Sequence, residues 1–348
     1  MGRRAHLSLT VVVALGLAAG ACGDGGGGGS SSAATVAEAK ESGAVDARLK
    51  VITTVAPITS IAANVAGGLA DIEGVVPEGT NSHTFEPAPR VAEVLSEADL
   101  VFVNGLMLEE PTREMAEENM KAGAKLVELG AEVLPESEWV YDFSFPKEEG
   151  KPNPHLWTDP TYAKKYAEII RRELSARDAG NGAVYQRNYD AFAALVDELD
   201  RAMRTSFATL PREKRRLLTY HDAYAYFARS YDWEVIGAIQ VESFEDPSPR
   251  EVAALIDQVK AAGVPAIFGS EVFPSPVLEQ MGRESGVRYV AELRDDDLPG
   301  GPGDAEHSWA GLMRFDYRTM VEELGGDASA LEAFVARDVA PDHARYPQ

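Results

Sequence analysis

From residue 48 onwards, short apolar runs alternate with longer stretches in which apolar residues recur every three or four positions. The short runs are rich in Val, Ile and Leu, which is typical of strands, whereas the longer spacing indicates amphipathic helices. We expect strands over residues 49–55, 71–76, 100–103, 125–129, 215–221, 234–239, 264–269 and 288–291. Strands that alternate with helices predict parallel sheets covered on both faces, so the expected fold class is α/β.

The helical pattern is longest over residues 183–210, which would span about 42 Å as one helix. Such a helix is long for the surface of a small domain and suits a strut between two lobes. We therefore predict two Rossmann-like lobes with parallel sheets, residues 48–176 and 213–348, joined by one long bridging helix within residues 177–212. The other expected helices cover residues 57–67, 89–97, 115–122, 161–176, 222–231, 249–262, 276–285 and 308–324.

The N-terminal residues have a different pattern, typical of a secretory signal peptide. Arg3 and Arg4 precede an apolar run over residues 7–19, and small residues then lead to Cys22. The run is short for a membrane span. We expect residues 1–21 to be removed. The small residues before Cys22 resemble a bacterial lipobox, which implies lipidation of its thiol; ordinary cleavage beside an incidental cysteine is the alternative.

Residues 22–47 are expected to form a lipidated cysteine and a flexible tether, because glycine and serine dominate residues 25–32. A lipid anchor followed by such a tether indicates an extracytoplasmic protein anchored to the cell membrane. Cys22 is the only cysteine, so an intramolecular disulfide is excluded.

The charge balance is strongly acidic, with 33 Lys and Arg against 56 Asp and Glu and a net charge of −23. Nucleic acid binding needs a basic face, so this class of function is not expected. The acidic excess is spread along the chain, which favours solubility and does not by itself specify a ligand.

Three of the six histidines occupy similar local settings. His83 and His221 follow predicted strands, and His155 lies on a loop that Pro154 and Pro160 stiffen just before a predicted helix. In open parallel sheets ligands gather beyond the carboxyl ends of the strands. Two lobes face to face would therefore point these imidazoles into a common interlobe cleft, although unrelated loop histidines remain the alternative.

An acidic loop around Asp296 also leaves a strand end in the second predicted lobe. Three imidazoles and one carboxylate would make a closed four-ligand site, which suits zinc. A closed site leaves no position for an activated water, so such a site binds metal and does not catalyse.

Three sequence motifs carry a family resemblance. Ser82 to Pro87, Asn153 to Pro160 and Thr219 to Phe227 resemble, in order and spacing, the three histidine motifs of the zinc/manganese-type (cluster A-I) solute-binding lipoproteins of metal ABC importers. The likeness covers residues 49–326. It implies two α/β lobes bridged by a long helix, with a metal ion held between them and delivered to a membrane permease powered by a cytoplasmic ATPase.

Carried over to this chain, the resemblance implies that His83, His155 and His221 are metal ligands. The family's fourth ligand is a carboxylate in the late loop, and the pattern fits best at Asp296; Asp295 and Glu292 stay open, because three aspartates stand in a row. Histidine in the third motif, where manganese-selective members often have glutamate, favours Zn²⁺ over Mn²⁺. Residues 135–152 lack the histidine-rich loop of many zinc members, which argues against an accessory metal-gathering role.

Three further carboxylates are candidates for orienting the ligand imidazoles through their ring N–H groups, namely Glu86, Asp222 and Glu271. Surface or helix-capping carboxylates are the alternative for each. Because imidazoles must lose their protons before they coordinate a metal, affinity is expected to fall in acid.

The expected function is therefore extracytoplasmic, high-affinity capture of a divalent transition metal by a monomer that is not an enzyme. The expected partners are the permease and ATPase of an ABC importer and, through the lipid, the membrane. Two alternatives remain: a secreted metalloenzyme with an open metal site, and a surface adhesion lipoprotein of the same fold.

Overall fold

The computed structural model describes residues 48–238, 248–272 and 276–347, together with the side chains of these residues except Ala262, Ala291 and Glu292. The predicted signal peptide, Cys22 and the tether lie outside the described residues.

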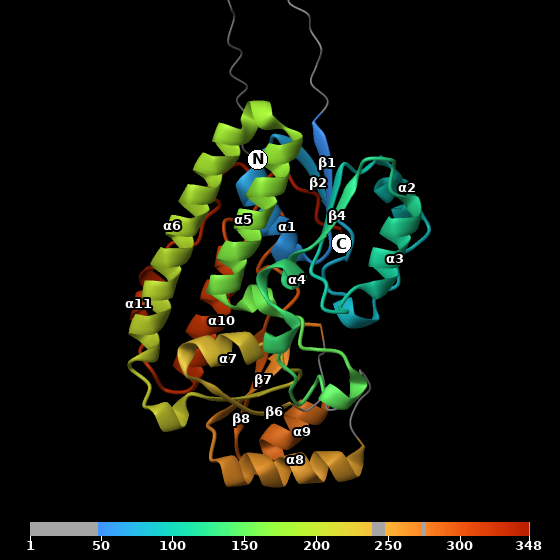
Figure 1. The fold of residues 1–348 in the computed structure, drawn as a ribbon. Coiled ribbons are helices and arrows are strands. Elements are labelled where there is room, and N and C mark those ends of the chain that lie inside the picture. The colour runs from blue at the N-terminus through green and yellow to red at the C-terminus, as the bar shows by residue number, and fades with distance from the viewer. Residues whose placement is uncertain (1–47, 239–247, 273–275, 348) are drawn as a thin grey trace, which may run out of the picture. The chain divides into compact units, whose positions relative to one another are not determined.

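Two parallel four-stranded sheets organise the described part of the chain (Figure 1). Their strand orders are β2-β1-β3-β4 and β6-β5-β7-β8, so the same winding occurs twice. This arrangement confirms the α/β class and the two Rossmann-like lobes. The strands are β1 (Leu49–Thr53), β2 (Ala70–Gly74), β3 (Leu100–Val103), β4 (Lys125–Glu128), β5 (Arg216–Thr219), β6 (Glu234–Ala238), β7 (Ala266–Ser270) and β8 (Arg288–Leu293).

Helices follow the strands as the apolar spacing predicts. Pro57, Pro111 and Pro160 each occupy the first turn of a helix, where a missing N–H costs no hydrogen bond. The helices are α1 (Ala56–Ala66), α2 (Arg90–Glu97), α3 (Glu110–Asn119), α4 (Leu129–Val133), α5 (Pro160–Arg177), α6 (Gly182–Phe207), α7 (Ala225–Tyr231), α8 (Pro249–Ala262), α9 (Pro276–Ser285), α10 (Trp309–Glu323) and α11 (Ser329–Ala333).

Helix α6 is the long helix that the sequence predicts. It packs against α1 and α5 beside the first sheet and against α10 and α11, which follow the second sheet in the chain (Figure 1). Its buried positions recur at spacings of three and four and include Tyr185, Phe192, Leu199 and Met203. The aromatic stripe is therefore core packing that joins the two halves.

The hydrophobic core is also continuous between the halves, since one buried cluster runs from Val51 to Ala336. Trp309, at the start of α10, is fully buried against Phe192, with ring centroids 5.4 Å apart. Its indole N–H donates to the carbonyl of Trp157 at 2.9 Å. Helix α10 is thus bonded directly to the segment that follows His155.

The C-terminal tail returns to the first sheet. Arg345 pairs beside the edge strand β2, where its N–H donates to the carbonyl of Ile72 and its carbonyl accepts from the N–H of Gly74. Two residues later, the carbonyl of Pro347 accepts from the N–H of Glu78 at 3.1 Å. Arg345 and Pro347 therefore hold the end of β2 and the start of the loop that leads to His83.

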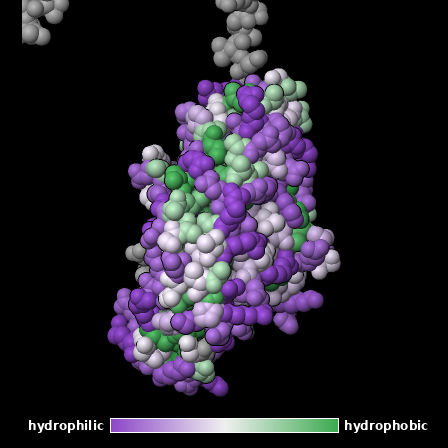
Figure 2. Space-filling view, turned by 90° about the vertical axis from the view of Figure 1, so that its left-hand side faces the viewer, coloured by the Kyte–Doolittle hydropathy of each residue, from purple (hydrophilic) through white to green (hydrophobic). Residues whose placement is uncertain are grey.

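The surface is mostly hydrophilic on the face that carries α6, with small separated hydrophobic areas (Figure 2). Among the described residues, none of the helices combines the length and the apolar character that crossing a membrane requires.

Candidate metal centre

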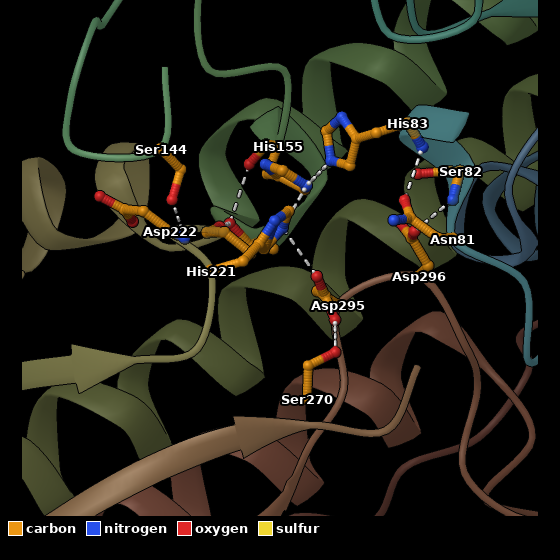
Figure 3. A network of polar contacts seen from close by, with 12 residues as sticks. Asn81, Ser82, His83, Ser144, His155, His221, Asp222, Ser270, Asp295 and Asp296 are labelled. Carbon is orange, nitrogen blue, oxygen red and sulfur yellow. Dashed lines mark hydrogen bonds and ion pairs between the residues drawn. The ribbon is translucent and has the colours of Figure 1, made fainter. Parts of the chain in front are cut away.

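Three histidines meet between the two sheets (Figure 3). His83 lies in a short 3₁₀ helix (Ser82–Thr84) after β2, and His155 directly precedes another (Leu156–Thr158) that leads into α5. His221 comes two residues after β5. The structure therefore brings together side chains separated by 72 and 66 residues along the chain.

The three imidazoles point their Nε2 atoms at one another. Nε2 of His155 lies 3.2 Å from Nε2 of His83 and 3.1 Å from Nε2 of His221. Donors on a tetrahedral zinc ion, with Zn–N bonds of 2.0–2.1 Å, would be about 3.3–3.4 Å apart. The two distances from His155 are therefore close to the spacing of donors that share one small cation.

Asn153 fixes the tautomer of His155. Its Oδ1 lies 2.9 Å from Nδ1 of His155, and an amide oxygen can only accept, so Nδ1 carries the proton and Nε2 keeps its lone pair. The same oxygen accepts from the backbone N–H of His155, while Nδ2 donates to the side chain of Asp142 and the carbonyl of Asp222. Sequence reasoning missed this role, although Asn153 stands inside the second motif.

The aspartate run comprises Asp295, Asp296 and Asp297, and the side chains of the first two point in different directions (Figure 3). Oδ2 of Asp295 lies 2.9 Å from Nε2 of His221, and its Oδ1 accepts from the hydroxyl of Ser270. Oδ2 of Asp296 accepts from the backbone N–H of Ser82, beside His83. Oδ2 of Asp297 accepts from the N–H of Gly79. The aspartate loop thus binds both the third histidine and the loop of the first.

The donor group whose atoms all lie within 4.8 Å of one another consists of the three histidines; among the described side chains it includes no carboxylate. Asp295 touches one member of that group, and Oδ1 of Asp296 is buried without a hydrogen-bond partner among the described residues. The side chain of Glu292, the remaining candidate, lies outside the described part.

The three carboxylates expected to orient the imidazoles have other surroundings. Glu86 is exposed. Asp222 is buried and accepts from the N–H of Tyr224. Glu271 accepts from the N–H groups of Asp295 and Asp297, so it shapes the aspartate loop.

Burial sets the charge state of the site. Loss of water lowers the pKa of the His221 ring to about 4 and holds the pKa values of His83 and His155 well below the usual value, with mutual repulsion adding to the effect; His83 nevertheless keeps some exposed surface. All three rings are therefore neutral at pH 7, the state that coordinates a metal. Burial also raises the pKa of Asp295 well above its usual value, and that of Asp296 to about 6.

Two aromatic side chains pack on the histidines. The Trp157 ring lies 5.0 Å from the His155 ring, and its N–H donates to the carbonyl of Asp295. Phe145 lies within 6.0 Å of all three imidazoles and is 7% exposed. No sequence pattern pointed to Phe145, because two of the three histidines beside it, His83 and His221, come from distant segments.

Comparison with known proteins identifies the family. The sequence model described as "ZnuA: Zinc-uptake complex component A periplasmic" matches residues 51–323. The chain belongs to this family. Zinc-uptake component A proteins are substrate-binding proteins of metal ABC transporters and are not enzymes, which confirms the sequence-based assignment.

Curated relatives of this zinc-uptake component family are named for different metals. The chain is 28% identical over 276 residues to the manganese-binding lipoprotein MntA of Halalkalibacterium halodurans, covering 79% of this chain and 88% of that one. It is 30% identical over 278 residues to the iron-binding protein YfeA of Yersinia pestis, covering 80% and 87%. The periplasmic zinc-binding protein TroA from Treponema pallidum has the same fold, with a TM-score of 0.72 and 26% identity over 80% of this chain and 99% of that chain.

Proposed function

We propose that this protein captures one divalent transition metal ion between its lobes, outside the cytoplasm, and delivers it to the permease of an ABC importer with its ATPase. The observation that carries the proposal is the convergence of three imidazoles, in which Nε2 of His155 lies 3.1–3.2 Å from Nε2 of each of the other two. The family and its relatives, which are named for metal binding and metal transport, support the same function.

Zinc is the cargo that the donor set favours over manganese. Three imidazoles are borderline donors that suit zinc, whereas manganese prefers oxygen ligands. The relatives are named for manganese, iron and zinc, so the preference rests on the donors of this chain. The third imidazole, that of His221, is the donor that favours zinc over manganese.

We assign the fourth ligand to the aspartate run. Sequence register favours Asp296, but Oδ2 of Asp295 lies 2.9 Å from Nε2 of His221, close to the spacing of about 3.3–3.4 Å expected between two ligands of one zinc ion. Asp295 is therefore the first candidate on geometry, and Asp296, with its unbonded buried oxygen, is the second. A carboxylate also offsets part of the cation's charge in a buried site.

Membrane attachment at Cys22, after removal of residues 1–21, completes the proposal. A lipid on this cysteine and a tether over residues 22–47 would keep the lobes, residues 48–176 and 213–348, near the permease while leaving them free to tumble. We propose that residues 177–212 link the two lobes and that the protein functions as a monomer.

The test combines elemental analysis of the purified protein with equilibrium titration of zinc and manganese. We expect one metal ion per chain for the wild type and loss of high-affinity binding in His83→Ala, His155→Ala and His221→Ala. His343→Ala is the matched control, since His343 is exposed and lies in the tail. Binding that survives all three substitutions would refute the proposed site, and normal growth of a deletion strain in metal-poor medium would refute the transport role.

A further inference from the structure

Phe145 lies against all three candidate ligands. Its ring centroid is 5.3 Å from that of His83, 5.7 Å from that of His155 and 6.0 Å from that of His221. We propose that Phe145 shields the bound metal from water and so determines how fast the protein releases it. This inference rests on the proposed metal-binding function.

The geometry places the phenyl ring over one face of the histidine group. The three imidazole centroids lie 5.1, 5.0 and 4.6 Å apart, and Phe145 forms the fourth corner of an irregular tetrahedron of rings. A phenyl ring offers no lone pair to a cation and fills space that water would otherwise occupy. A metal ion leaving through this face, or water and a competing ligand entering, must first displace the ring.

A tight turn over residues 142–145, here called the cap turn, holds Phe145 in place. Oδ1 of Asp142 accepts from the N–H groups of Ser144 and Phe145, and the N–H of Asp142 donates to the carbonyl of Phe145. Oδ2 of Asp142 accepts from Nδ2 of Asn153 at 2.8 Å. The residue that fixes the His155 tautomer therefore also anchors the cap turn.

The cap turn is bonded to the second half of the chain as well. The backbone N–H of Asp222, next to His221, donates to the hydroxyl of Ser144 at 3.0 Å (Figure 3). The carbonyl of Asp222 accepts from Nδ2 of Asn153 at 2.6 Å. Because these bonds connect the two halves of the chain, Phe145 stays packed on the imidazoles only while His221 remains beside the other two histidines.

The same turn provides a matched control. Phe143 stands two residues before Phe145 and has the same side chain, but it is 45% exposed, against 7% for Phe145. A phenyl ring removed from position 143 takes little from the protein interior, whereas removal from position 145 opens the space above the imidazoles. Comparing Phe145→Ala with Phe143→Ala therefore separates the shielding effect of the Phe145 ring from a general disturbance of the cap turn.

The experiment measures zinc release from the full-length, zinc-loaded protein after mixing with excess chromophoric chelator in a stopped-flow instrument. We expect Phe145→Ala to release zinc about tenfold faster or more, since changes around a bound ligand act mostly on the off-rate. Phe145→Leu, which refills part of the space, should restore most of the wild-type rate. Phe143→Ala should release zinc at the wild-type rate.

Different outcomes would refute the role of Phe145 and the proposed metal-binding function on which it rests. Equal rates of zinc release from Phe145→Ala and Phe143→Ala would refute the shielding role of Phe145. A wild type that binds no metal would refute the proposed function instead. If Phe145→Ala does not fold, as judged by unfolding of the metal-free protein, Ser144→Ala decides, because it removes the hydroxyl that accepts from the N–H of Asp222 and leaves the Phe145 ring in place. That variant should accelerate release, and an unchanged rate would refute the cap.

Discussion

The aspartate run allows a sharp comparison between two isosteric substitutions. In Asp295→Asn the amide oxygen can still accept from the hydroxyl of Ser270, but an NH₂ group replaces the carboxylate oxygen that lies 2.9 Å from Nε2 of His221. An amide nitrogen has no lone pair for a cation. In Asp296→Asn the amide oxygen can still accept from the N–H of Ser82, so the loop contact survives.

The magnitude follows from burial, since Asp295 is 2% exposed. Removing one partner of a buried charge pair costs about 3–5 kcal/mol. At about 1.4 kcal/mol per tenfold change, Asp295→Asn should weaken zinc binding by roughly two to three and a half orders of magnitude. Asp296→Asn removes a neighbouring charge and should weaken binding only about tenfold to a hundredfold, the range for groups that support a ligand.

The assay is competition titration of zinc against a chelator of known affinity, with both variants compared in one buffer. Unfolding of the metal-free proteins serves as the control, because both substitutions change a buried carboxyl group. If Asp296→Asn loses more affinity than Asp295→Asn, the ligand is Asp296 and the distance argument is wrong. Equal and small losses would refute a carboxylate ligand at either position.

Two further predictions concern the imidazoles and their surroundings. Zinc affinity should fall between pH 7.5 and pH 5, because the raised pKa values of Asp295 and of Asp296 (about 6) let protons compete for the carboxylates, whereas the His221 pKa of about 4 delays competition at the rings. The same titration repeated across pH checks this, and a flat profile down to pH 5 contradicts it. Asn153→Ala should weaken zinc binding about 10- to 100-fold, because His155 loses the acceptor that holds its Nδ1 proton, and affinity equal to the wild type would refute that role.

Sequence patterns predicted the strands and the long helix closely, because both depend on local apolar spacing. Helix α3 shows where this fails: the apolar pattern predicted residues 115–122, but the helix begins at Glu110, with Pro111 in its first turn and few apolar residues to reveal it. Helix α7 begins at Ala225, three residues later than predicted, because the side chain of Asp222 accepts from the N–H of Tyr224 and holds a turn there.

The candidate site was predictable to a different degree at each residue. His83, His155 and His221 stand in separate motifs, so their convergence followed from the order of the elements. Asp295 and Asp296 are adjacent and chemically identical, and only the backbone direction decides which one faces His221. Such a difference arises from packing between the halves, which local sequence patterns do not encode.

The C-terminal tail has a practical consequence for purification. The carbonyl of Pro347 is bonded to the N–H of Glu78, at the start of the loop that carries His83. A polyhistidine tag fused at this end of the chain would therefore lie close to the loop that carries His83, and its imidazoles would compete with the candidate ligands for metal. Affinity handles for metal titrations belong elsewhere or must be cleaved before the measurement.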